Sequence, residues 1–281
     1  MIEPVIVRAA TGAAAPLVLD SPHSGTVYPA DFRPACAPSL LRQAEDAYVD
    51  ELWGAAPAMG VAIVAAAFPR AYIDPNRSLE DMDPELLDAP WPGPVAPGDK
   101  TNRGIGLIWR LVNASHPIYD RKLTVAEVQG RIDRCWRPYH AALDRTLDEA
   151  QSRFGTVWHI DCHSMQSRGN RLSVDGPAAR RADFVLGDRD GTTCAPAFTR
   201  FIAERVAAMG YSVKVNDPYK GVEIVRRHGR PQDGRHSLQI ELSRALYMDE
   251  ESHARGPGFA KLQADLAALT RDILGFIGKQ Q

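Results

Sequence analysis

The sequence has few cysteines and no long apolar run. Its four cysteines, Cys36, Cys135, Cys162 and Cys194, lie far apart and form no CxxC pair, which argues against a cysteine zinc site and against a disulfide framework. No segment approaches the roughly 20 apolar residues that span a bilayer. The N-terminus lacks a basic stretch followed by an apolar one, so we expect a cytoplasmic protein without a membrane anchor.

Neither sign of charge dominates the chain. The 33 basic and 35 acidic residues are interspersed and leave a formal net charge of −2, so the composition predicts neither a nucleic-acid nor a membrane partner. A chain of 281 residues, 44% of them hydrophobic, can bury a sizeable core. We expect a single domain over residues 1–281, with a Pro- and Gly-rich insertion or lid at about 79–117. The oligomeric state stays open.

Residues 156–167 begin as an apolar, β-branched run and end in a polar cluster at 161–164. This pattern predicts a buried strand that ends near Asp161. Residues two apart on an extended chain point to the same side, so Asp161 and His163 would face one pocket and Cys162 would turn into the packing. A histidine steadied by a carboxylate suits a metal site. A purely structural His–Asp pair at a strand end is the alternative.

A second histidine follows the predicted strand at 16–20, within the turn SPHSG at 21–25. Pro22 restricts the residue before it and Gly25 permits a tight backbone path, so His23 would sit on an ordered turn. By itself the motif favours the alternative of a simple turn that exposes an imidazole. Two histidines at two strand ends nevertheless favour a shared ligand site.

Apolar residues recur every three to four positions over 40–59, and this spacing predicts one amphipathic helix. Its first half carries Glu45 and Asp46. Acidic residues on such a helix are usually solvated, but either of these two could supply an oxygen ligand, since catalytic zinc is often held by two histidines and one carboxylate.

The apolar run 61–67 predicts a buried strand, and Arg70, Asn76 and Arg77 leave it close together. A guanidinium can fork onto both oxygens of a carboxylate, so this loop has the chemistry to receive an acidic substrate. Surface arginines paired with neighbouring acidic side chains are the alternative.

In the strand predicted at 236–244, Gln239, Glu241 and Ser243 alternate with apolar residues. A carboxylate in the middle of a sheet is costly unless it is paired or functional. Glu241 is therefore our candidate general base, with a buried ion pair to an arginine as the alternative.

The remaining pattern alternates helices and strands. Further elements are predicted as a helix at 124–153 with a capping box and a break near Pro138, strands at 184–187 and 211–215, and helices at 196–209 and 256–276. Alternation of this kind predicts an α/β fold, a three-layer αβα sandwich with a mixed, largely parallel central sheet.

The motifs together resemble the N-formylglutamate amidohydrolase family, whose members are similar in fold to zinc carboxypeptidases and aspartoacylases, with a phosphorylase/hydrolase-like sandwich. The resemblance covers nearly the whole chain. It is carried by SPHSG at 21–25, the acidic pair at 45–46, PRAYIDPNR at 69–77, DCHSM at 161–165, NDPYKG at 216–221 and QIELSRALYMDE at 239–250.

By this resemblance His23 and His163 would bind one zinc ion, or another divalent metal, together with a carboxylate from the acidic pair. We assign that carboxylate to Asp46 rather than Glu45. Asp161 would orient His163 from behind.

The resemblance also implies an activity, the hydrolysis of N-formyl-L-glutamate to formate and L-glutamate in histidine degradation. Glu241 matches the family's catalytic glutamate, and Asn76 with Arg77 resembles the pair that receives a substrate carboxylate. A small dicarboxylate needs a second cation, which Arg70 or Arg244 could provide.

Three other functions stay open. A related zinc hydrolase could act on another N-acyl amino acid or on a peptide C-terminus. A metal-free hydrolase could use Ser164 or Ser24, although neither lies in a GxSxG motif. A non-catalytic protein that binds an acidic metabolite would need the arginines but not Glu241.

Overall fold

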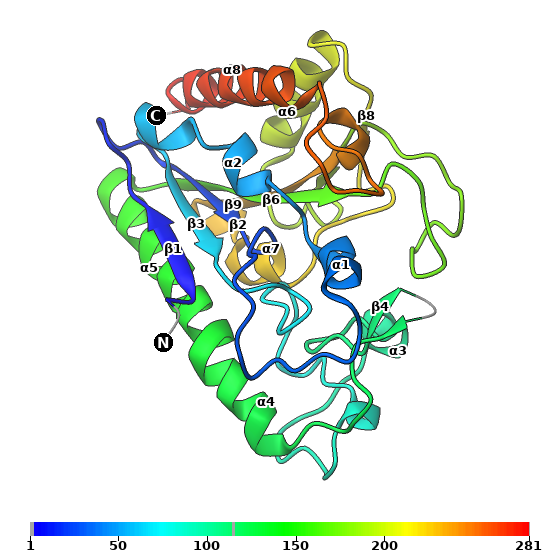
Figure 1. Cartoon of the computed structure of the whole chain (residues 1–281). Helices are drawn as coiled ribbons and strands as arrows, with labels where there is room; N and C mark the ends of the chain where they lie inside the picture. The colour runs from blue at the N-terminus through cyan, green and yellow to red at the C-terminus, as the bar shows by residue number, and fades with distance from the viewer. Residues whose placement is uncertain (1–2, 114–115, 281) are drawn as a thin grey trace.

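The computed structural model describes residues 3–113 and 116–280, and a seven-stranded sheet lies at its centre (Figure 1). The strand order is β1-β3-β2-β6-β9-β7-β8. Neighbours pair in parallel except at β1–β3 and β7–β9. The strands are β1 (Val5–Arg8), β2 (Leu17–Ser21), β3 (Ala62–Ala66), β6 (Val157–Met165), β7 (Phe184–Gly187), β8 (Val213–Val215) and β9 (Arg235–Ser243), with a separate hairpin of β4 (Leu111–Asn113) and β5 (His116–Pro117).

Helices cover both faces of this sheet (Figure 1). Along β2, Leu17 and Leu19 pack into the core under α6 and α8, whereas Val18 packs into the opposite core with α5. The predicted three-layer sandwich with a largely parallel sheet is thus confirmed. The helices are α1 (Pro38–Leu41), α2 (Val49–Leu52), α3 (Asp99–Asn102), α4 (Val125–Arg131), α5 (Arg137–Phe154), α6 (Pro196–Ala208), α7 (Glu223–His228) and α8 (Phe259–Ile277).

Short 3₁₀ and π segments join the main elements. The 3₁₀ segments are η1 (Arg42–Ala44), η2 (Ala56–Met59), η3 (Pro84–Leu86), η5 (Pro231–Asp233) and η6 (Arg244–Leu246), and η4 (Ile132–Trp136) is a π-helical turn. Within the described residues, no helix is both long and apolar enough to cross a membrane.

The helix predicted from residue 124 is confirmed together with its cap and its irregularity. The Thr124 side chain accepts from the backbone N–H of Glu127, and the Glu127 side chain accepts from that of Thr124. The π-helical turn η4 separates α4 from α5 directly before Pro138. A proline lacks the N–H that would continue a regular α-helical ladder, so the wider turn falls where the break was expected.

The prediction of one helix over 40–59 is wrong. Four short helical segments, α1, η1, α2 and η2, replace it, and Tyr48 between η1 and α2 has a left-handed backbone with φ of 65°. The backbone N–H of Asp46 donates to the carbonyl of His23 at 3.0 Å instead of to a helical partner. Tertiary contact with the His23 turn therefore overrides the local amphipathic pattern.

The prediction that a strand ends near Asp161 is also wrong, because β6 continues through the polar cluster to Met165. Its pairing with β9 runs without interruption from Val157↔Arg235 to Met165↔Ser243. The predicted alternation holds, since Cys162 packs into the core on the α6 and α8 side. α7 was not anticipated from the sequence.

The Pro- and Gly-rich segment at 79–117 is tied to the rest of the domain. Met82, Leu107 and Ile108 are buried in the core beside α5. The backbone N–H of Asp74 donates to the carbonyl of Leu107 at 2.8 Å. The segment thereby lies against the loop that follows β3, and its role as a moving lid stays a prediction.

Candidate metal centre

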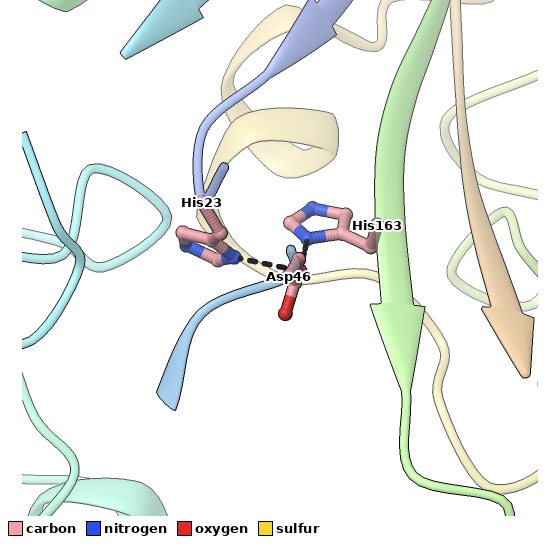
Figure 2. Close-up of side chains that lie close together, drawn as sticks. All are labelled: His23, Asp46 and His163. Atoms are coloured by element: carbon pink, nitrogen blue, oxygen red, sulfur yellow. Dashed lines mark hydrogen bonds and ion pairs between the residues drawn. The ribbon is translucent and has the colours of Figure 1, made fainter. Parts of the chain in front are cut away.

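Three side chains from separate parts of the chain converge at one point (Figure 2). His23 follows β2, His163 lies on β6, and Asp46 lies in the turn between η1 and α2. Oδ2 of Asp46 is 3.3 Å from Nδ1 of His23 and 3.0 Å from Nδ1 of His163. The three ligand atoms lie within 4.8 Å of one another, and all three residues are buried. Glu45 points elsewhere, to the hydroxyl of Tyr28 at 2.5 Å.

Each imidazole has a further carboxylate on its opposite edge. Nε2 of His23 lies 2.7 Å from Oδ1 of Asp74, and Nε2 of His163 lies 2.7 Å from Oδ1 of Asp161. The place of Asp161 agrees with its expected position behind His163. Asp74 was expected only as a possible ion-pair partner of Arg70 and Arg77, and its contact with His23 was not predicted. A carboxylate before a proline carries little signal of its own.

The surroundings of the two rings call for a cation. A neutral imidazole has one N–H and one lone pair, yet every ring nitrogen of His23 and His163 faces a carboxylate oxygen. A metal ion beside Oδ2 of Asp46 resolves this, because both Nδ1 lone pairs would point to it while both Nε2–H groups donate outward. Two imidazoles and one carboxylate are also a donor set of catalytic zinc sites. The cluster therefore fits a divalent metal ion.

The electrostatics of the cluster favour the ionised form of its carboxylate. Burial by itself would raise the pKa of Asp46, but Arg70 and the two histidines outweigh burial and hold this pKa well below its usual range. Burial and the charge of Arg70 lower the pKa of His23. For His163 burial also acts downward, but Asp161 and Asp46 outweigh it and hold the pKa well above the usual value.

Arg70 and Arg244 both donate to Oδ1 of Asp46, the oxygen that does not face the two histidines. Nη1 of Arg70 is 3.3 Å and Nη2 of Arg244 is 3.0 Å from Oδ1, which leaves Oδ2 for the histidines. Arg70 also forks onto Oδ2 of Asp74, with its Nη2 at 2.9 Å. Both guanidiniums, expected as candidate partners of a substrate carboxylate, thus lie in the site and are occupied by carboxylates of the protein.

Asn76 and Arg77 also reach the site. Nδ2 of Asn76 lies 3.4 Å from Oδ2 of Asp161 and 3.1 Å from Nε2 of His163, so Asn76 and His163 share the two oxygens of Asp161. Arg77 donates from Nη1 to the carbonyl of Asn76 at 2.8 Å and from Nε to that of Ile105 at 3.1 Å. The Asn–Arg pair contacts the metal cluster and one wall of the cavity.

Glu241 lies directly beside His163 in the sheet, as its register partner on β9. Nε2 of Gln239 donates to Oε1 of Glu241 at 3.0 Å. Burial raises the pKa of Glu241 above its usual range, against the lowering influence of His163. In the described part of the chain Glu241 has no ion pair with an arginine, so the structure does not support the alternative of a structural salt bridge.

These groups line one cavity of about 380 Å³. The cavity wall contains His23, Asp46, His163 and Glu241, together with residues of the 79–117 segment. Seven of its lining residues are arginine or lysine and two are aspartate or glutamate. A cavity of this charge and size suits a small anionic substrate.

Among the described residues, neither candidate serine bonds to a side chain that could act as its base. The hydroxyl of Ser24 bonds to Ser21 and to the backbone of Asp46, and that of Ser164 accepts from Arg244. Within residues 3–113 and 116–280, neither hydroxyl bonds to a histidine. A metal-free mechanism that uses either serine therefore lacks its activating group.

Comparisons with known proteins point to one family. Residues 15–248 match the N-formylglutamate amidohydrolase family. Two relatives named N-formylglutamate deformylase are each 30% identical: one from Pseudomonas aeruginosa, over 92% of this chain and 90% of the relative, and one from Pseudomonas putida, over 84% and 82%. The crystal structure of an N-formylglutamate amidohydrolase from Ralstonia eutropha JMP134 is 52% identical, covers 100% of both chains and superimposes with a TM-score of 0.96.

Proposed function

This chain belongs to the N-formylglutamate amidohydrolase family, and we propose that it hydrolyses N-formyl-L-glutamate to formate and L-glutamate with a metal ion held by His23, Asp46 and His163. The observation that carries the metal site is the convergence of these three buried side chains beside the buried carboxylate of Glu241. The activity is hydrolysis of an amide bond, as the names of the relatives indicate.

We propose zinc as the metal, because two imidazoles and one carboxylate leave a coordination position open in catalytic zinc sites. When bound, zinc supplies Lewis-acid chemistry, lowering the pKa of a water molecule and polarising a carbonyl oxygen. Asp74 and Asp161 hold the two imidazoles with Nδ1 facing inward. Arg70 and Arg244 keep Asp46 ionised and oriented by occupying its other oxygen.

Glu241 is the proposed general base and acid. Its carboxylate accepts the proton of the attacking water and later donates it to the leaving nitrogen of glutamate. A raised pKa suits both steps, because a carboxyl group that titrates closer to neutral pH can accept the proton and release it again. Gln239 holds one oxygen of Glu241 and so limits its rotation.

The positive cavity supports a dianionic substrate. N-formylglutamate carries two carboxylates. The cavity wall has seven basic residues and two acidic ones. Arg77, at the cavity wall, is our proposed contact for one of the two substrate carboxylates.

The cytoplasmic location stays a prediction from the sequence.

A formate-release assay tests the proposal. The purified protein should release formate from N-formyl-L-glutamate and act much more slowly on N-acetyl-L-glutamate and N-formyl-L-aspartate. Dialysis against a chelator should abolish release, and added zinc should restore it, with one metal ion bound per chain by elemental analysis. Full activity of the metal-free protein would refute the metal site, and an absence of formate release from the zinc-loaded protein would refute the activity.

A further inference from the structure

One cation in the cavity wall differs from all the others. Lys100 lies in the short helix α3 of the 79–117 segment, and its side chain lines the cavity that contains the metal cluster. Its ammonium group has no hydrogen bond or ion pair with any residue that the structure describes.

Every other arginine or lysine of this cavity already has an acceptor in the protein. Arg70, Arg77 and Arg244 bond to buried carboxylates or backbone carbonyls in the metal site. The acceptors of the outer three are Leu172 O for Arg103, Asp175 for Arg181 and Asp190 for Lys220.

A partly buried ammonium group without an acceptor is unfavourable in the free protein. Burial, together with the positive charges of Arg77 and Arg70, lowers the pKa of Lys100 to about 7, while Asp74 and Glu241 act in the opposite direction. The same neighbours show that Lys100 lies within electrostatic reach of the catalytic glutamate. A carboxylate bound beside it would provide the missing acceptor and favour the charged form.

The backbone holds Lys100 in place. Its carbonyl accepts from the backbone N–H of Ile105 at 2.9 Å, and Leu107, two residues on, is bonded through its own carbonyl to the backbone N–H of Asp74. The position of Lys100 is thus linked to the loop that carries Asp74, the carboxylate beside Nε2 of His23. A lysine whose backbone is held in this way has a defined position relative to the reacting centre, unlike a lysine on a flexible loop.

We propose that Lys100 binds one of the two carboxylates of the substrate and so selects dianionic over monoanionic N-formyl amino acids. This proposal rests on the proposed function, since it names the part of N-formylglutamate that the 79–117 segment recognises. It also gives that segment a role as a wall of the substrate site.

The test compares substrates that differ by one charge. Wild type, Lys100→Met and Lys214→Met are assayed with N-formyl-L-glutamate, with N-formyl-L-glutamine and with the α-amide N-formyl-L-isoglutamine. Lys214 is the control, because it is exposed, pairs with Asp217 and does not line the cavity. Methionine keeps the length of the apolar stem and removes the charge.

We expect Lys100→Met to lower kcat/KM for N-formylglutamate by about 10- to 100-fold, mainly through KM, as for loss of a hydrogen bond to a charged group. The amide that lacks the carboxylate recognised by Lys100 should lose less than about threefold, which identifies that carboxylate. Lys214→Met should stay within about threefold of wild type on all three substrates. Equal loss on all three substrates in Lys100→Met, or no loss on any, would overturn the proposal.

Calorimetric binding of L-glutamate, L-glutamine and L-isoglutamine provides a readout that does not depend on turnover. Wild type should prefer glutamate over both amides, and Lys100→Met should lose most of its preference over the amide that lacks the carboxylate recognised by Lys100. A wild type that releases no formate refutes the proposed function, and the calorimetric comparison then decides the role of Lys100 alone. An unchanged preference over both amides in Lys100→Met overturns that role.

Discussion

Oδ1 of Asp74 lies 2.7 Å from Nε2 of His23, on the edge of the imidazole opposite to the one that faces Asp46. Asp161 stands in the same relation to His163. The nitrogens that would face a metal ion are therefore determined by two carboxylates, one in the loop after β3 and one on β6. Such partners fix the tautomer and the orientation of a ligating ring.

Asp74→Asn and Asp161→Asn should each weaken metal binding by about 10- to 100-fold. The uncharged amide oxygen accepts the hydrogen bond of the imidazole N–H more weakly than a carboxylate does. The ring therefore loses both its fixed orientation and part of its basicity. Competition with a chromophoric chelator measures the affinity. Asp31→Asn, at an exposed side chain that pairs with Arg134, is the control and should bind metal like wild type. Unchanged metal affinity in both Asp74→Asn and Asp161→Asn would contradict the role given to these carboxylates.

Glu241→Gln should reduce kcat by about 10²- to 10⁴-fold and leave one metal ion bound. The amide keeps the volume of the side chain and removes its capacity to accept a proton. Kinetics and elemental analysis on the same preparation separate the two properties. Glu204→Gln, at an exposed position of α6, should leave both unchanged. If Glu241→Gln retains most of its turnover, another group is the base.

Arg244→Met separates two roles for this guanidinium. Because Nη2 of Arg244 donates to Oδ1 of Asp46 at 3.0 Å, we expect the variant to lose metal affinity by about tenfold or more. If Arg244 only bound a substrate carboxylate, its removal would instead raise KM and leave the metal affinity unchanged. Metal titration combined with steady-state kinetics at saturating zinc distinguishes the two outcomes.

Gly25→Ala should destabilise the fold by about 1–3 kcal/mol and lower metal occupancy. A Cβ at Gly25 would meet the backbone of Phe68 and lie 2.6 Å from the carbonyl oxygen of Ala67, so the turn that carries His23 must move. Gly275→Ala is the matched control, because a Cβ there meets nothing within 4 Å, and it should be neutral or stabilising by about 0.5–1 kcal/mol. Thermal unfolding with and without zinc checks both variants.

The buried His140 should make the fold sensitive to acid. Its ring packs on Trp136 with centroids 3.9 Å apart, and Nε2 lies 2.9 Å from the carbonyl of Pro75. Burial lowers the pKa of His140 to about 4, so below pH 6.5 the unfolded chain binds a proton that the folded chain does not. Stability is therefore lost as the pH falls from about 6.5 to about 4, by up to about 3 kcal/mol for this group.

Denaturant unfolding at pH 7 and pH 4 measures this effect. His140→Gln will cost stability at pH 7, but its further loss between the two pH values should be smaller than that of wild type by about 2–3 kcal/mol. His116→Gln, at an exposed histidine, should retain the full loss. An identical loss in wild type and His140→Gln would exclude His140 as the source.

Part of this protein could be predicted from the sequence, because the alternation of side chains along a strand is a local signal. The pattern of 156–167 placed Asp161 and His163 on one side and Cys162 on the other, and the structure has this alternation. The alternating residues of 236–244 likewise indicated that Glu241 shares a face with Gln239. In both segments the periodicity of two determines the facing whatever the neighbouring strands are.

The tertiary structure alone decided how these groups pair. The apolar spacing at 40–59 indicated a helix, but the contact of Asp46 with the His23 turn breaks it and brings the carboxylate between two imidazoles. The bonds of Arg70 and Arg244 to Asp46, and the lack of an acceptor for Lys100 among the described residues, depend on side-chain distances between segments far apart in the chain. Local patterns determine which way a side chain faces, whereas its partner is determined by long-range packing, which competes with and here outweighs the local preference.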